Sequence, residues 1–117
     1  MQEDEFTMPG IVRVTAAALD YAREFSESIG ASYGGRYVTT FDWAETIGVR
    51  ENRDAPLQQL GPCLLLGGYE RREVPSKFIQ KAGRFEFSVK IPENIWKGSQ
   101  ERTIDVDDNK PFGLVLR

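Results

Sequence analysis

The sequence predicts an α+β fold, in which short, mostly antiparallel strands build a β-rich sheet and one N-terminal helix packs on it. Residues 16–29 are the one stretch with apolar side chains at helical spacing. Elsewhere, short runs of β-branched and aromatic residues recur, separated by glycine, proline and the Asp-Asp-Asn group at 107–109. Because short connections favour antiparallel pairing, these runs predict the sheet, and the helix would cover one of its faces.

The length of 117 residues indicates one domain, with a flexible leader at residues 1–10 and the domain itself at residues 11–117. The net charge of −3 argues against a nucleic-acid partner, because phosphate contacts require a basic excess. The longest apolar run, residues 63–66, is far shorter than the ~20 residues that cross a bilayer. The acidic N-terminus does not resemble a signal peptide, so we expect a cytoplasmic protein that does not bind membranes.

The predicted helix follows a short β-prone run at residues 11–14. Thr15 is placed at its N-cap, where a hydroxyl can accept a hydrogen bond from an amide of the first turn. Gly30 is placed to end the helix, because glycine readily takes the left-handed conformation. The apolar positions at helical spacing are Ala18, Ala22, Phe25 and Ile29.

The middle of the chain is predicted to alternate strands with polar segments. Residues 36–42 are rich in β-branched and aromatic side chains and predict a strand, and residues 46–50 predict a weaker one. Residues 51–61 are polar, contain proline and glycine, and predict a surface loop.

A glycine pair then lies between two β-prone runs, residues 62–66 and 69–74. Since Gly67 and Gly68 both accept a positive φ, this pattern predicts a β-hairpin that turns at the pair. The next segment, residues 77–83, is predicted as a connector with room for one helical turn.

The last third of the chain contains the clearest strand, residues 84–91, in which apolar and polar side chains alternate. Residues 93–99 predict a turn region. Two further strands, residues 102–106 and 112–116, enclose the turn at 107–111. The apolar face of the clearest strand carries Phe85, Phe87, Val89 and Ile91.

Composition excludes several kinds of site. The chain has no histidine, which removes the imidazole that Ser-His-Asp and Cys-His sites require. Its one cysteine, Cys63, lies beside Pro62 and three leucines, so we interpret it as a buried structural residue. Asp105, Asp107 and Asn109 have the spacing that begins a calcium loop, but the glycine and glutamate that complete such a loop are missing. We therefore assign no catalytic, metal or cofactor-binding residue.

Two sets of side chains are left open as functional candidates. Paired carboxylates can perform acid–base chemistry when their pKa values are separated. The acidic residues that could meet in space are Asp42, Glu45, Glu70, Glu86 and Asp105. Aromatic side chains can line a ligand site or an interface, with core packing as the competing interpretation. The aromatic candidates are Tyr37, Trp43, Tyr69 and Trp96.

Two separate parts of the chain resemble one known family. Residues 85–99 read FEFSVKIPENIWKGS, and they lead into TIDV at 103–106 and the closing run at 112–116. Residues 12–18 read VRVTAAA, a strand followed by a cap and the start of a helix. Together these segments resemble the HesB/IscA-like domain of A-type iron–sulfur carriers. Residues 43–83 do not match and would be an insertion.

The resemblance implies a HesB-like fold without the chemistry of the family. Carriers of this family use three cysteines, one after the second strand and two near the C-terminus, and Cys63 matches none of these positions. Because iron–sulfur clusters need thiolate ligands or a few histidines, we expect no cofactor. The leading hypothesis is a non-enzymatic HesB-like domain without a cluster site, which acts through protein–protein contacts or self-association as a homo-oligomer. A small-ligand binding module and a carboxylate-dependent, histidine-free enzyme are the alternatives.

Overall fold

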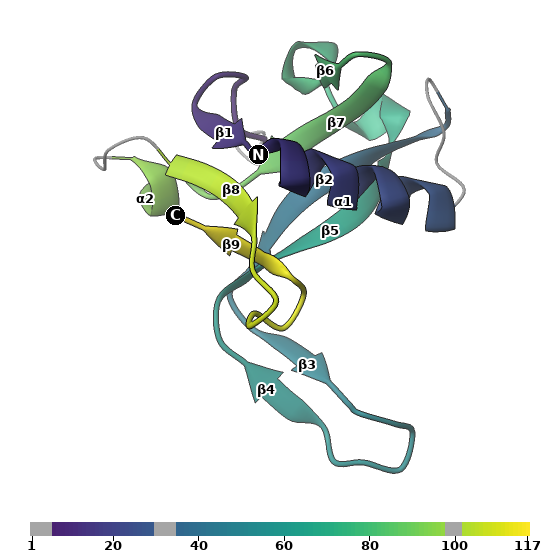
Figure 1. The fold of residues 1–117 in the computed structure, drawn as a ribbon, viewed down its shortest axis with the longest axis vertical. Helices are drawn as coiled ribbons and strands as arrows, with labels where there is room; N and C mark the ends of the chain where they lie inside the picture. The colour runs from purple at the N-terminus through teal and green to yellow at the C-terminus, as the bar shows by residue number, and fades with distance from the viewer. Residues whose placement is uncertain (1–5, 30–34, 98–101) are drawn as a thin grey trace.

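The computed structural model describes residues 6–29, 35–97 and 102–117, and these form an α+β fold, as predicted (Figure 1). The strands are β1 (Val12–Val14), β2 (Tyr37–Ala44), β3 (Ile47–Val49), β4 (Gln58–Leu60), β5 (Cys63–Glu70), β6 (Gln80–Ala82), β7 (Phe85–Lys90), β8 (Arg102–Val106) and β9 (Leu114–Leu116). The helices are α1 (Ala16–Ser28) and α2 (Glu93–Trp96), with 3-10 turns at η2 (Arg71–Glu73) and η3 (Ser76–Phe78).

The strands form a central sheet, a small sheet and a two-stranded arm. The central sheet has the order β5-β2-β7-β6, the small sheet has the order β1-β8-β9, and β3 pairs with β4 in the arm. The expectation of antiparallel pairing needs a correction for two pairs, β2–β7 and β1–β8, which are parallel. Both pairs join strands that lie far apart in the chain, so no tight turn constrains their direction.

Helix α1 lies across one face of the central sheet (Figure 1). Its N-cap is Thr15, as predicted, and the Thr15 hydroxyl accepts a hydrogen bond of 3.1 Å from the Ala18 amide. Ala18 and Ala22 are buried, whereas Ile29, which we expected on the same buried stripe, is 41% exposed. Ile29 is the C-cap of the helix, and the predicted stop signal at Gly30 lies outside the described residues.

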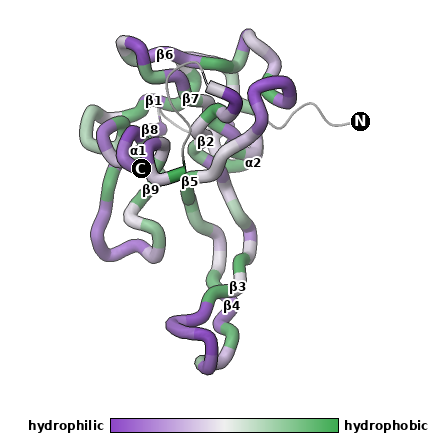
Figure 2. The backbone as a smooth tube through the Cα atoms, turned by 90° about the vertical axis from the view of Figure 1, so that its right-hand side faces the viewer, coloured by the Kyte–Doolittle hydropathy of each residue, from purple (hydrophilic) through white to green (hydrophobic). Residues whose placement is uncertain are grey.

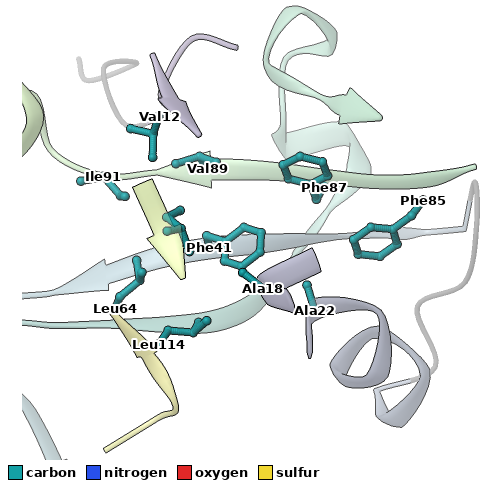
Figure 3. Close-up of a cluster of buried hydrophobic side chains, with 11 residues drawn as sticks. Val12, Ala18, Ala22, Phe41, Leu64, Phe85, Phe87, Val89, Ile91 and Leu114 are labelled. Atoms are coloured by element: carbon teal, nitrogen blue, oxygen red, sulfur yellow. The ribbon is translucent and has the colours of Figure 1, made fainter. Parts of the chain in front are cut away.

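The main hydrophobic core lies between α1, the central sheet and the small sheet (Figure 3). The predicted alternation of β7 is confirmed, since Phe85, Phe87 and Val89 all enter this core. Ile104 and Leu114 enter it from the small sheet. Each buried side chain of this size stabilises the fold by roughly 1.5–3 kcal/mol, so this shared core holds the two sheets together.

The opposite face of the central sheet has its own smaller cluster, formed by Val38, Val74 and Phe78 with Phe6 packed against it. Phe6 belongs to the segment expected to be a flexible leader, yet its ring stacks on Phe78 with the centroids 5.8 Å apart.

The next residue of the expected leader, Thr7, is tied to the edge of the central sheet. Thr7 is 3% exposed, and its amide donates a hydrogen bond of 2.7 Å to the Val89 carbonyl. Its hydroxyl donates to the Ile91 carbonyl at 3.2 Å. The leader prediction is therefore corrected at residues 6 and 7, because Phe6 packs against the smaller cluster and Thr7 bonds to the part of β7 that β6 leaves open. Residues 1–5 lie outside the described residues.

The predicted hairpin at Gly67 and Gly68 is wrong. β5 continues straight through both glycines and pairs with β2, with Gly67 opposite Thr40. The glycine at 68 permits a close approach instead of a turn, because a Cβ there would lie 3.1 Å from Ile29 Cδ1. The run predicted as a strand at 69–74 passes into the 3-10 turn η2.

The hairpin of this region is the arm, which projects away from both sheets (Figures 1 and 2). The sequence predicted a weak strand at 46–50 and a loop at 51–61, but β4 lies inside that loop segment. It pairs with β3 so that Ile47 stands opposite Leu60. The arm thus belongs to residues 43–83, the part that does not match the HesB-like motifs.

Two connecting segments contain short elements. The turn region at 93–99 includes α2, and the connector at 77–83 overlaps the single helical turn η3 at its start and then includes β6. Both elements have too few residues for a periodic pattern to be recognised.

Candidate functional site

A groove of about 300 Å³ opens where the arm leaves the central sheet and passes the β8–β9 hairpin. Its apolar walls come from the end of β2, the junction between β4 and β5, and β9. These side chains are Trp43, Leu60, Pro62, Leu64, Leu114 and Leu116. A concave and mostly apolar surface of this size is typical of a ligand site.

The floor of the groove is the outer surface of the main core. Leu64 and Leu114 are buried, and Trp43 and Leu116 pack against the same cluster. The Trp43 indole is also held at its polar end, because its Nε1 donates a hydrogen bond of 2.9 Å to Glu45. Since close packing restricts side chains to defined rotamers, the groove is largely pre-formed.

Cys63, the one cysteine of the chain, lies in the wall of the groove. It is half-buried, so the prediction of a buried residue holds only in part. Burial raises the pKa of the thiol above its ordinary value of 9.0, because desolvation disfavours the thiolate. The thiol is therefore protonated and weakly nucleophilic at neutral pH.

Two cationic side chains, and no carboxylate from the described residues, line the groove. Arg102 stands at the start of β8, where its Nε donates to the Arg117 backbone oxygen at 3.1 Å and its Nη1 donates to the Ile95 carbonyl at 3.3 Å. Lys110 lies in the exposed β8–β9 turn and forms no ion pair within the described part of the chain. The charge of the groove therefore suits an apolar ligand that carries an anionic group.

The four aromatic candidates do not form one site. Trp43 lines the groove, whereas Tyr37 is 38% exposed and does not line it. Tyr69 lies on the opposite face of the central sheet, where its hydroxyl donates a hydrogen bond of 2.6 Å to Asp42. Trp96 packs against the main core, and its Nε1 donates to a backbone carbonyl at 3.0 Å. Of the four, Trp43 alone lines the groove.

The acidic candidates are also dispersed, and each has its own partner. The partners are Tyr69 for Asp42, Trp43 for Glu45, Arg72 for Glu70, Arg71 for Glu86, and Thr15 with Arg117 for Asp105. No aspartate or glutamate of the described residues is buried. Nor do the described residues contain a group of three side chains that could hold a metal ion. The convergent acid pair that a carboxylate enzyme requires is therefore not formed by the described residues.

Sequence reasoning missed most of the groove. Leu60, Pro62 and Leu114 carry no local pattern that distinguishes them from ordinary core or loop residues. The neighbours of Cys63 in the chain do not indicate its position beside β9, because that position depends on packing between distant segments.

Comparison with known proteins adds no assignment, since no family model, no curated protein and no solved structure matches this chain. In the ranges that the structure describes, no helix has the length and apolar character needed to cross a membrane.

Proposed function

We propose that this protein is a non-enzymatic binding module and that the groove is its ligand site. The observation that carries the proposal is an open apolar groove of about 300 Å³ whose floor is continuous with the buried core. A ligand in the groove would cover apolar surface at Leu60, Pro62 and Leu116. Covering such surface contributes roughly 25 cal/mol per Å² to the free energy of binding, before the costs of association are subtracted.

The proposal includes a HesB-like domain without a cluster site. In support, β1, the Thr15 cap and α1 follow one another in the order that the opening motif implies. β7, β8 and β9 likewise coincide with the strands implied by the closing motif. Cys63 is the one thiol in the sequence, and a single thiolate is too small a ligand set for an iron–sulfur cluster.

Catalysis is left out of the proposal for two reasons. The Cys63 thiol is protonated at neutral pH, so a nucleophilic role would need an activating base, and the chain has no histidine. The acidic candidates are engaged in separate hydrogen bonds and ion pairs on different parts of the molecule.

Two small probes that share one apolar skeleton, 4-phenylbutanol and 4-phenylbutyrate, test the proposal. Binding in the groove covers Cys63, so we expect both probes to slow its alkylation by iodoacetamide. Because Cys63 is the one thiol of the chain, the reaction reports on this site alone. From typical ligand efficiencies, probes of this size should bind with dissociation constants in about the millimolar range.

A pair of variants on the arm provides the control. Leu60→Ala removes part of the groove wall and should weaken the protection, whereas Leu57→Ala should not, because Leu57 lies outside the groove and is 53% exposed. An alkylation rate that neither probe changes at saturating concentration would contradict the proposal.

A further inference from the structure

The guanidinium of Arg102 lines one end of the groove, where β8 begins and β9 finishes. Two of its three nitrogens donate to main-chain oxygens, Nε to Arg117 at 3.1 Å and Nη1 to Ile95 at 3.3 Å. Within the described part of the chain, the third nitrogen, Nη2, forms no hydrogen bond. Because a guanidinium is planar and always charged, the two bonds hold a free cationic donor in a fixed position.

The two cations of the groove, Arg102 and Lys110, lack a carboxylate partner. None of the ion pairs formed among the described residues includes either of them. Three aspartates lie between them in the chain, at 105, 107 and 108, and none of the three lines the groove. Asp105 and Asp107 are engaged in hydrogen bonds of their own, to Thr15 and to a backbone amide of the β8–β9 turn. The charged side chains that line the groove are therefore both positive.

Apolar surface adjoins the charged end of the groove. Trp43 and Leu116 line the same groove and pack against the main core. The volume of about 300 Å³ lies at the lower end of the range for small-molecule sites, so a matching ligand has a small apolar body and one anionic group. A phosphate group presents three strong acceptor oxygens, whereas a carboxylate presents two. The single free nitrogen of Arg102 therefore suits a carboxylate better than a phosphate.

We propose that the groove binds a small apolar monocarboxylate. Its carboxylate accepts a hydrogen bond from Arg102 Nη2, and its hydrocarbon body covers Trp43 and Leu116. Lys110 contributes a longer-range attraction from the β8–β9 turn. This inference rests on the proposed binding function and adds the chemical class of the ligand. Because charge-assisted hydrogen bonds are stronger than neutral ones, the groove should distinguish an acid from an alcohol of the same skeleton.

Three probes on one skeleton measure this preference: 4-phenylbutyrate, 4-phenylbutanol and 4-phenylbutylamine. Their dissociation constants come from the concentration dependence of Cys63 protection, because a bound charge near the thiol also changes its reactivity at saturation. At low ionic strength the acid should bind about three- to tenfold more tightly than the alcohol, and the amine should bind more weakly than the alcohol. The difference between acid and alcohol should shrink in 0.5 M salt, because salt screens charges at an open site.

The outcomes for the three probes separate the two proposals. Equal dissociation constants for the acid and the alcohol, or tightest binding of the amine, would overturn the carboxylate inference and leave the binding function in place. Protection by none of the three would contradict the binding function itself.

Substitutions identify the cation that holds the carboxylate. Arg102→Gln should bring the dissociation constants of acid and alcohol to within about twofold of each other, whereas Arg102→Lys keeps the charge and should retain part of the preference. Lys110→Gln should lower the preference by no more than about twofold, as expected for an exposed and more distant charge. Lys81→Gln, on β6 at the far edge of the central sheet, is the matched control and should leave the preference unchanged.

The alcohol reports on the integrity of the groove in each variant, because it binds without a charge. If Arg102→Gln abolishes binding of the alcohol as well, the lost bonds to Ile95 and Arg117 have altered the groove, and the Nε–H resonance of Arg102 in the wild-type protein decides. This resonance should shift with 4-phenylbutyrate and far less with 4-phenylbutanol. An Arg102 resonance that saturating 4-phenylbutyrate does not shift would overturn the inference. So would a preference that Lys110→Gln removes and Arg102→Gln retains.

Discussion

The Thr15 hydroxyl and the Asp105 carboxylate connect α1 to the small sheet. Thr15 donates a hydrogen bond of 2.9 Å to Asp105 while it accepts one of 3.1 Å from Ala18. Asp105 also accepts from the Val106 amide at 2.8 Å and from Arg117 at 3.3 Å. One carboxylate therefore bonds to residues of the helix cap, its own strand and the residue that follows β9.

This arrangement predicts a loss of stability in acid. The Val106 amide, and after it the Thr15 hydroxyl and Arg117, lower the pKa of Asp105 below its ordinary value of 3.8, because they favour the carboxylate. A group with a depressed folded-state pKa contributes stability above its unfolded pKa and loses it as the pH falls through the folded pKa. Urea unfolding between pH 6 and pH 2 should show this fall below about pH 4.

The variants identify the group responsible. Asp105→Asn should reduce the free energy of unfolding at neutral pH and flatten its decline in acid. Asp108→Asn, an exposed acid of the neighbouring turn, should keep the pH dependence of the wild type. If Asp105→Asn shows the same pH profile as the wild type, the carboxylate does not have this role.

At the scale of elements, α1 determines the shape of the turn before β9. The Tyr21 hydroxyl on α1 donates a hydrogen bond of 2.8 Å to the Phe112 carbonyl. Gly113 follows with a φ of 78°, and a Cβ there would lie 2.9 Å from the Tyr21 hydroxyl oxygen. The glycine is required both by its backbone conformation and by the contact with the helix.

A second glycine, Gly83, allows the cost of the backbone conformation to be measured apart from the cost of crowding. Gly83 also has a positive φ, of 66°, but nothing lies within 4 Å of a Cβ built on it. Gly83→Ala should therefore cost about 1–2 kcal/mol for its backbone alone. Gly113→Ala should cost about 1–3 kcal/mol more through crowding. Urea unfolding measures the free-energy cost of each substitution. Adding Tyr21→Phe should restore part of the stability lost in Gly113→Ala and none of that lost in Gly83→Ala. Equal costs for the two glycine substitutions would show that Tyr21 does not crowd a side chain at residue 113.

At the scale of the whole molecule, two sheets and α1 share one core, and the arm lies outside it (Figures 2 and 3). The radius of gyration is 14.3 Å, compared with roughly 13 Å for a compact chain of this length. The distal part of the arm buries little, because residues 50–57 are all exposed apart from the half-buried Ala55. A two-stranded hairpin of this kind is only marginally stable alone.

The arm tip should therefore be dispensable for folding. Replacing residues 50–57 with Asn-Gly should change the free energy of unfolding by no more than about 0.5 kcal/mol, because these residues lie outside both hydrophobic clusters. Phe41→Ala, which empties a fully buried site in the main core, should cost about 3–5 kcal/mol. Chemical unfolding measures the free energy of unfolding of both variants. A large loss of stability in the variant with the shortened arm would show that the arm tip supports the core.

The elements that depend on short-range chemistry were determined by the sequence alone. Thr15 and the alanines after it define the start of α1, and the alternation from Phe85 onward defines the faces of β7, because caps and side-chain periodicity act within a few residues. Composition likewise limited the available metal and nucleophilic chemistry, since a chain with one cysteine and no histidine has few such ligands.

Tertiary structure alone decided the path of β5 and the formation of the groove. Gly67 and Gly68 have the pattern of a turn, but pairing with β2 keeps them in a strand. The groove exists because packing brings Leu60 and Leu114 together from distant parts of the chain. Burial and strand pairing at such separation are cooperative properties of the whole fold, so no local pattern in the sequence encodes them.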